Sequence, residues 1–122
     1  MKDDVLLAND AFYQAIRNGD TVGMEALWAA RRPVSCTHPG WSALTGRRSV
    51  MESWQALLTE QEPPELWPSG ACAVVTGGTA MVICIEQIDG IELMACNGFV
   101  WEDGAWRLTD HQAAPVTAAQ AG

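Results

Sequence analysis

Three residues of this chain, His38, Asn97 and Asp110, carry side chains that could together form an acid–base site. Histidine changes charge near neutral pH, so His38 can act as a general base or a general acid. A carboxylate that reaches Nδ1 of the imidazole orients the ring, and this role is open to Asp110. An amide N–H can stabilise a developing oxyanion, and this role is open to Asn97. The sequence thus contains the parts of a catalytic acid–base site, provided that the fold brings them together.

A metal site is a second use for such residues, because Cys36 and His38 stand two positions apart and would point the same way on a strand. Zinc needs three or four protein ligands, and no second pair at ligand spacing follows. The sequence also contains no phosphate loop, nucleophile elbow or dinucleotide fingerprint. We therefore expect no metal and no cofactor, and we interpret Cys36 as a small apolar packing residue.

Composition limits the classes of function further. The 122 residues include 15 acidic and 7 basic side chains, for a net charge of −8. This balance disfavours nucleic acids and anionic membrane surfaces as partners. The start of the chain has no apolar segment of signal-peptide length, and no apolar run approaches the roughly 20 residues of a membrane span. With four cysteines and no CxxC pair, we expect a cytoplasmic protein.

The elements that must position these residues fall into two groups. Residues 4–18 place apolar side chains at helical spacing, and Asn18–Gly19 ends that helix. A second helix begins at Asp20 or Thr21, and a third covers about 45–58. The length fits one domain, residues 1–122, and the Ala-rich segment 117–122 is interpreted as a loose tail.

The second half of the chain has the composition of β-strands. Two-residue connections, Gly77–Gly78, Asp89–Gly90 and Asp103–Gly104, separate its apolar runs, and such pairs favour the tight turns of β-hairpins. Helices followed by a strand meander predict an α+β fold, with three N-terminal helices on one face of an antiparallel sheet. The strands are expected at residues 34–37, 71–76, 79–88, 91–101 and 105–112.

Strand alternation assigns side chains to faces. With regular strands, Asn97 shares a face with Phe99 and Trp101, and Asp110 and Gln112 share a face with Trp106 and Leu108, opposite His111. Polar groups on such an apolar surface cost roughly 1–3 kcal/mol each when they are buried without partners. They form either a structural network or the lining of a ligand pocket. Two further walls of that pocket are expected at Trp41 and Trp54.

Several segments together resemble the SnoaL-like members of the nuclear-transport-factor-2-like (NTF2-like) superfamily over about residues 5–116. The most specific are Phe12-Tyr13-Gln14-Ala15-Ile16-Arg17-Asn18-Gly19-Asp20 and His38-Pro39-Gly40-Trp41. The match continues with Gly46-Arg47, Ser53-Trp54, Asn97-Gly98-Phe99 and residues 106–116, which include Asp110-His111-Gln112-Ala113-Ala114-Pro115. The resemblance implies a cone-shaped half-barrel, a cystatin-like roll with a strongly curved mixed or antiparallel sheet. It also implies a cavity between sheet and helices, and a homodimer through the outer face of the sheet.

Within that superfamily, the ketosteroid isomerases provide a test of activity. The resemblance places Phe12 at the position of their oxyanion-donating tyrosine, whereas Tyr13 is expected to face elsewhere. His38 stands at the position of their aspartate general base, and Asn97 stands at or near that of their protonated aspartate. The acid–base pair of those isomerases is therefore absent as such, and we do not expect that activity.

Two functions remain open from the sequence. The first, slightly favoured by the missing isomerase residues, is a non-catalytic domain whose pocket holds a small apolar molecule. The second is a cofactor-free lyase, isomerase or cyclase that acts on a small apolar carbonyl compound. His38 would be its base, Asp110 would orient His38, and Asn97 would stabilise the oxyanion. In either case the pocket lining is expected to include Phe12, Trp41, Trp54, Phe99, Trp101 and Gln112.

Overall fold

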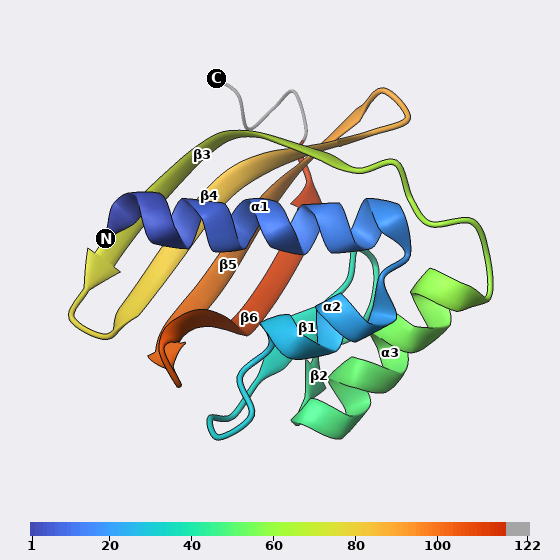
Figure 1. Ribbon diagram of the computed structural model, residues 1–122. Coiled ribbons are helices and arrows are strands. Elements are labelled where there is room, and N and C mark those ends of the chain that lie inside the picture. Colours follow the sequence, from blue (N-terminus) through green and yellow to red (C-terminus); the bar gives the residue numbers. More distant parts are fainter. Residues whose placement is uncertain (117–122) are drawn as a thin grey trace.

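A computed structural model describes residues 1–116 of the chain. Three helices, α1 (Lys2–Asn18), α2 (Thr21–Leu27) and α3 (Arg47–Thr59), pack on a curved, open, six-stranded sheet (Figure 1). The strands are β1 (Ser35–Thr37), β2 (Leu44–Thr45), β3 (Trp67–Thr76), β4 (Thr79–Ile88), β5 (Ile91–Glu102) and β6 (Ala105–Pro115). The expected α+β class and cone-type fold are confirmed. The predicted loose tail, 117–122, lies outside the described residues.

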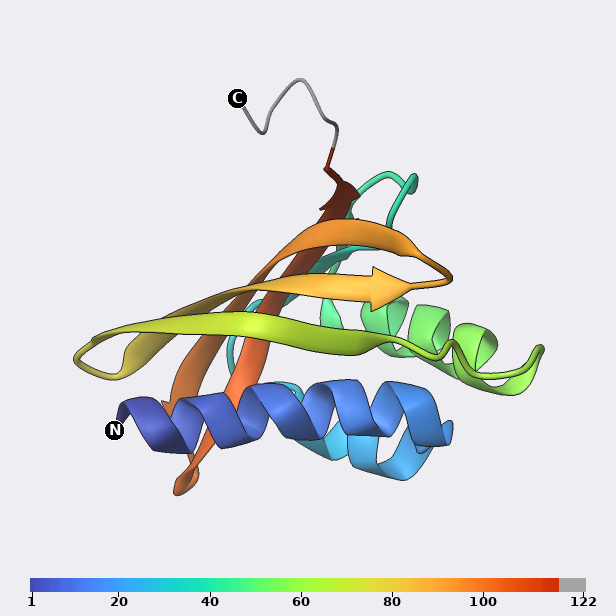
Figure 2. The same cartoon turned by 90° about the horizontal axis from the view of Figure 1, so that it is seen from above.

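The helices form where the apolar spacing placed them, with small differences at their ends. Gly19 ends α1 in the left-handed conformation at φ 62°, where its N–H bonds the carbonyl of Ile16. The Asp20 side chain then accepts a hydrogen bond from the backbone N–H of Gly23 and caps α2. Figure 2 shows that α1 runs along one side of the sheet, and this side is the inner face of the fold. In the described residues, no helix has the length and hydropathy that crossing a membrane requires.

The sheet is a meander of β3 to β6, extended by the two short strands. Each expected hairpin turn is present, and Asp89 and Asp103 take the positive φ values, 49° and 53°, that two-residue turns require. The last strand, β6, pairs with β1 in parallel, so the sheet is mixed. Strand β3 begins at Trp67, before the expected residue 71, and β2 was not expected at all.

A β-bulge in β6 changes which of its residues face inward. Gly98 pairs with Asp110 while Phe99 pairs with Leu108, so Thr109 is an extra residue that opposes no partner. Beyond this point the alternation is reversed, and His111 is buried whereas Asp110 and Gln112 are exposed. The face assignment made from regular alternation is therefore wrong for all three residues.

Glycine at position 98 permits the bulge. A Cβ atom there would lie 2.9 Å from an Asp110 carboxylate oxygen and 3.2 Å from the Thr109 hydroxyl, which is closer than side-chain atoms normally approach. Since Gly98 stands opposite the extra residue, it gives the bulged segment of β6 the space it needs.

Candidate functional site

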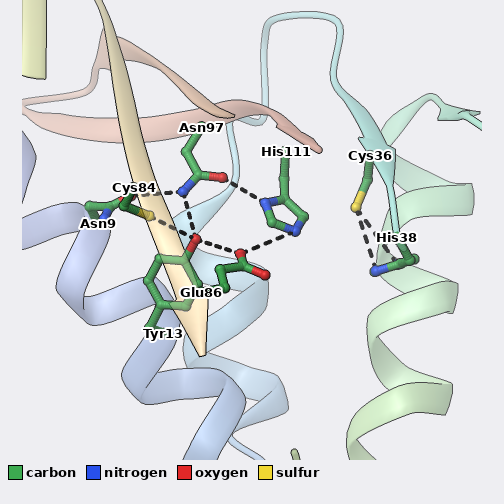
Figure 3. Close-up of polar contacts among 8 residues, drawn as sticks. All are labelled: Asn9, Tyr13, Cys36, His38, Cys84, Glu86, Asn97 and His111. Atoms are coloured by element: carbon green, nitrogen blue, oxygen red, sulfur yellow. Dashed lines mark hydrogen bonds and ion pairs between the residues drawn. The ribbon is translucent and has the colours of Figure 1, made fainter. Parts of the chain in front are cut away.

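A polar cluster lies at the centre of the inner face, between α1 and the sheet, with Asn97 of β5 as its hub (Figure 3). Asn97 is fully buried, and its amide nitrogen donates to Oδ1 of Asn9 at 2.9 Å and to the hydroxyl of Tyr13 at 3.0 Å. These two bonds leave the amide oxygen of Asn97 directed at Nδ1 of His111, 2.6 Å away. An amide oxygen only accepts, so Nδ1 of His111 carries the hydrogen of that bond.

Glu86 of β4 is the acidic member of the cluster and is only 1% exposed. Its Oε2 accepts a hydrogen bond from the Tyr13 hydroxyl at 2.6 Å. Burial raises the pKa of Glu86 to about 7, an effect that the Tyr13 bond partly offsets by favouring the charged form. Burial also raises the pKa of Tyr13, and the Glu86 charge adds to that effect. Near neutral pH, both the protonated and the ionised form of Glu86 are therefore populated.

His111 lies beside Glu86, with its Nε2 at 4.0 Å from Oε2 of the carboxyl. Burial, followed by the neighbouring His38, lowers the pKa of His111 to about 3. At neutral pH the ring is thus uncharged, with a hydrogen on Nδ1 and a lone pair on Nε2. Near neutral pH the pair therefore exchanges between a carboxylic acid and a carboxylate, each beside a neutral imidazole.

His38, at the end of β1, belongs to a second group on the α3 side. Its Nε2 lies 2.9 Å from the hydroxyl of Ser53, which itself donates to the carbonyl of Val50 at 2.7 Å. Because the serine hydrogen is used in that bond, Nε2 of His38 is the donor to Ser53. Burial lowers the pKa of His38 to about 4. His38 and His111 are therefore both neutral at physiological pH.

The sulfur of Cys36 lies 3.6 Å from Nε2 of His38, so these residues face the same way, as their spacing indicated. Burial, followed by the charge of Glu86, raises the pKa of Cys36 to about 12, and the side chain stays a thiol rather than a reactive thiolate. Over residues 1–116 no cluster of three or more His, Cys, Asp or Glu side chains has the arrangement of a metal site.

A mostly apolar space adjoins both groups, and we call it the inner cavity. Its volume is about 380 Å³. Glu86, His111 and His38 are the polar members of its wall. The other lining residues are Ile16, Pro39, Trp41, Trp54, Leu57, Pro64, Leu66, Ile88, Ile91, Leu93 and Pro115.

Some of the sequence-predicted site residues come together here. His38, Trp41 and Trp54 line the inner cavity, and both indole rings lie edge-on to the His38 ring, with centroids 4.8 and 4.7 Å away. Phe12 lies behind the cavity wall, where its ring contacts those of Tyr13, Trp54 and His111. Asn97 is also behind the wall and acts through His111 and Tyr13.

The remaining predicted residues lie elsewhere. Asp110 is exposed and accepts a hydrogen bond from the hydroxyl of Ser35 at 2.7 Å, so the expected contact with His38 is not formed. Gln112 is exposed on the same outer face. Phe99 is buried away from the cavity lining, and Trp101 is half-exposed with its ring against Trp106. The bulge at Thr109 explains the displacement of Asp110 and Gln112.

Three members of the polar cluster were missed or misplaced by sequence reasoning. Glu86 was not singled out, although alternation along β4 puts it on the same face as Ala80, Val82 and Cys84. Tyr13 was expected to face away, yet it is fully buried next to Phe12 because both consecutive residues of α1 point at the sheet. His111 was placed on the outer side, and the bulge could not be read from the sequence.

Comparison with known proteins identifies the class. The chain matches the SnoaL-like domain family over residues 5–118 and belongs to that family. An NTF2-like protein of Streptomyces avermitilis, named as a putative dehydratase, is similar at 33% identity and a TM-score of 0.89, with 96% of each chain covered. No match is found among curated proteins.

Two further solved structures share this fold and carry different functional names. A Thiobacillus denitrificans protein named as a putative association domain of calcium/calmodulin-dependent protein kinase type II is 26% identical, with a TM-score of 0.79 over 90% of this chain and 93% of that one. A Parabacteroides distasonis protein named as a putative ketosteroid isomerase is 11% identical, with a TM-score of 0.75 over 94% and 87%. The second likeness concerns the fold alone.

Proposed function

We propose that the inner cavity binds a small, mostly apolar molecule and that Glu86 and His111 move a proton on it without a cofactor, in a reaction of the lyase or isomerase kind. The observation that carries this proposal is the position of Glu86, a carboxyl group only 1% exposed on the wall of an otherwise apolar cavity. Its pKa of about 7 is suited to acid–base work at neutral pH.

The chemistry follows from the states of the two groups. A protonated Glu86 gives its proton to a leaving or enolising oxygen of the substrate and becomes a carboxylate. That carboxylate, 4.0 Å from Nε2 of His111, then stabilises the imidazolium formed when Nε2 removes a proton from substrate carbon. Transfer of this proton from His111 back to Glu86 restores the starting state. For a dehydration, the products are an alkene and water.

The residues behind the wall hold this pair in place. Asn97 fixes the tautomer of His111 by accepting from Nδ1, and Tyr13 fixes Oε2 of Glu86 by donating its hydroxyl hydrogen. Such partners orient acid–base groups as the carboxylate of a catalytic triad orients its histidine. His38, the base proposed from the sequence, has no carboxylate partner and lies on the Ser53 side of the cavity. We therefore assign it to the cavity wall.

The relative from Streptomyces avermitilis supports a lyase, because it carries a dehydratase name at 33% identity over nearly the whole chain. A fold as varied in function as this one gives no activity by itself. The buried pair of Glu86 and His111 provides the chemical basis for extending that name to this chain.

The test uses 3-hydroxycyclohexanone, a small and mostly apolar compound that forms a conjugated enone when it loses water. We expect enone formation, followed by its ultraviolet absorbance, to fall at least about 100-fold in Glu86→Gln, which keeps the shape but cannot exchange a proton at neutral pH. Glu25→Gln removes a carboxylate from an exposed site on α2 and should leave the rate unchanged. Equal rates in wild type and Glu86→Gln would contradict the proposal.

A non-catalytic binding domain is the second candidate, and the separation of His38 from Asp110 favours it because no triad-like arrangement is present around His38. Its signature is saturable binding of cyclohexyl compounds, followed by the fluorescence of Trp41 and Trp54, without turnover. Deuterium exchange at the α-carbon of cyclohexanone in D₂O distinguishes the two candidates, because it reports proton transfer even when no water is lost.

We further propose a homodimer formed through the outer face of the sheet. Exposed apolar side chains gather there, among them Val74, Met81, Ile83 and Met94. An apolar patch of this kind indicates a protein interface. The Thiobacillus denitrificans relative, named for an association domain, supports this proposal. Light scattering over a range of protein concentrations tests it, and a monomer at all concentrations would contradict it.

A further inference from the structure

The two histidines of the cavity wall already use their ring N–H groups in hydrogen bonds to partners behind the wall. Nδ1 of His111 donates to Asn97, so its other nitrogen, Nε2, presents a lone pair. Nε2 of His38 donates to Ser53, so the remaining Nδ1 of that ring is also an acceptor. Both neutral imidazoles therefore lack a free N–H for a ligand in the cavity.

The donors and acceptors of Glu86 can be identified in the same way. The hydrogen bond from Tyr13 occupies Oε2, and no hydrogen bond of the described residues reaches Oε1. In the ionised form, that oxygen is an acceptor. In the protonated form, the carboxyl carries the hydrogen that we propose for acid catalysis. At neutral pH the polar part of the wall is therefore dominated by hydrogen-bond acceptors.

No positive charge offsets these acceptors. Among the described residues, the wall of the inner cavity contains no lysine or arginine, and its other side-chain N–H groups are the indoles of Trp41 and Trp54. The indole nitrogen of Trp54 is buried and has no hydrogen-bond partner in the described residues. A carboxylate or phosphate placed here would meet lone pairs and a partly ionised carboxyl group, and it would lose its hydration and gain at most an indole N–H.

We infer that the inner cavity selects uncharged apolar molecules that carry a hydroxyl group, and that it rejects carboxylates and phosphates. A hydroxyl hydrogen satisfies Nε2 of His111 or Oε1 of Glu86, whereas a lone carbonyl oxygen leaves both acceptors unpaired and depends on an indole N–H or on the protonated carboxyl. This inference rests on the proposed function and narrows its substrates to neutral alcohols, for which elimination of water is the fitting reaction.

The experiment compares four probes on one scaffold: cyclohexylmethanol, cyclohexanecarbaldehyde, cyclohexanecarboxylate and cyclohexylmethylamine. Binding to the full chain is measured at pH 8 by calorimetry, with tryptophan fluorescence as the second readout. We expect the alcohol to bind at least about 10-fold more tightly than the aldehyde, which corresponds to about 1.4 kcal/mol. Weak or absent binding of the carboxylate is also expected.

Glu86→Gln tests the cause of the preference. The glutamine oxygen can accept from Tyr13, which directs its NH₂ group, a donor, into the cavity. We expect the preference to reverse in this variant, with the aldehyde binding more tightly than the alcohol. Glu25→Gln is the control, because it removes a charge from an exposed residue of α2 that does not line the cavity. This variant should retain the wild-type preference.

Three results would overturn the inference: a carboxylate or amine that binds more tightly than the alcohol, no binding of any probe at millimolar concentration, or an unchanged preference in Glu86→Gln. These results are separable from failure of the proposed function. Alcohol selectivity without turnover of 3-hydroxycyclohexanone supports the selectivity and contradicts the catalysis. Turnover of 3-hydroxycyclohexanone together with equal binding of alcohol and aldehyde supports the catalysis and contradicts the selectivity.

Discussion

Each face of β4 and β5 carries some side chains that are unusual for their surroundings. The inner face, which packs against α1, holds Glu86 and Asn97, both essentially inaccessible to solvent. The outer face of the same strands holds Met81, Ile83 and Met94, each more than a third exposed. Buried polar groups and exposed apolar groups both cost free energy in a folded monomer. The difference indicates that each face serves a purpose beyond folding.

On the inner face, hydrogen bonds offset the cost of burial. Asn97 makes three bonds and Tyr13 connects Asn97 to Glu86, so the polar cluster around Asn97 forms one network. Among its described members, the amide nitrogen of Asn9 is left without a partner. The outer face has no such compensation within the chain, which is why we propose a second copy as its cover. On our proposals, the inner face provides the acid–base groups and the outer face provides the contact with a second copy.

Exchange of the two residues after the bulge, Asp110→His together with His111→Asp, should have the largest effect, because the bulge holds position 111 inward and position 110 outward. The exchange buries a carboxylate beside Glu86, in place of the His111 ring that bonds Asn97. We expect a loss of more than about 4 kcal/mol in the free energy of unfolding, or no cooperative transition at all. Urea unfolding followed by tryptophan fluorescence measures it. The control is Thr109→Ala, which keeps the bulge and should cost less than about 1 kcal/mol.

The second prediction concerns the pH dependence that Glu86 imposes. Burial raises the pKa of this carboxyl from 4.5 to about 7, so the folded state holds its proton more tightly than the unfolded state does. Its contribution to stability is full below pH 4.5 and is lost as the pH rises through 7. His38 and His111 act in the opposite direction, because their lowered pKa values make the folded state less stable as the pH falls below 6.5.

Glu86→Gln separates these effects, since it removes the carboxyl and keeps both histidines. Relative to wild type, the variant should gain about 2 kcal/mol in unfolding free energy between pH 5 and pH 8, because one pKa unit corresponds to about 1.4 kcal/mol. The quantity to measure is the difference in unfolding free energy between the variant and the wild type, obtained by urea unfolding across that pH range. A free-energy difference that does not change with pH would mean that Glu86 titrates alike in the folded and unfolded states. That result would contradict the burial of Glu86 on the inner face.

Local rules predicted the fold well. The helical stripe of α1 and the hairpin turns at Asp89–Gly90 and Asp103–Gly104 depend on residues close together in sequence, and these features are present. The superfamily resemblance predicted the curved sheet, which is also confirmed. The parallel pairing of β1 with β6 joins segments about 75 residues apart, and its register could not be read from either strand alone.

The site was predicted less completely, for a specific physical reason. Face assignment by alternation assumes regular strands, and one extra residue at Thr109 exchanges His111 for Asp110. Glu86 required only the alternation of β4, but an acidic residue near a strand end is normally solvated, and nothing in the sequence marked it as buried. Its partner Tyr13 lies 73 positions earlier, so their contact is a property of the tertiary structure.

Tyr13→Phe is the third prediction and tests that contact. The variant removes the bond to Glu86 and leaves an Asn97 N–H without one of its partners, so we expect a loss of about 1–2 kcal/mol in unfolding free energy. The pKa of Glu86 should rise further, because the Tyr13 bond lowers it. Carboxyl titration by NMR measures this. Thr79→Val, which removes a hydroxyl from an exposed turn, should change neither quantity appreciably.

The smallest effect on stability is expected on the outer face. Met81→Lys places a charge on an exposed strand position, so the unfolding free energy of the monomer should change by no more than about 0.5 kcal/mol. The molar mass in solution should nevertheless fall from dimer to monomer, because a buried unpaired lysine at the interface is costly.

Val22→Lys is the matched control for that charge, since Val22 is an exposed apolar residue on α2, away from the sheet. It should leave both stability and molar mass unchanged. If Met81→Lys destabilises the monomer by several kcal/mol, the outer face is part of the intramolecular core and the contrast between the faces fails. If it changes neither property while the wild type remains dimeric, the interface lies elsewhere, and the exposed side chains of β4 and β5 require another explanation.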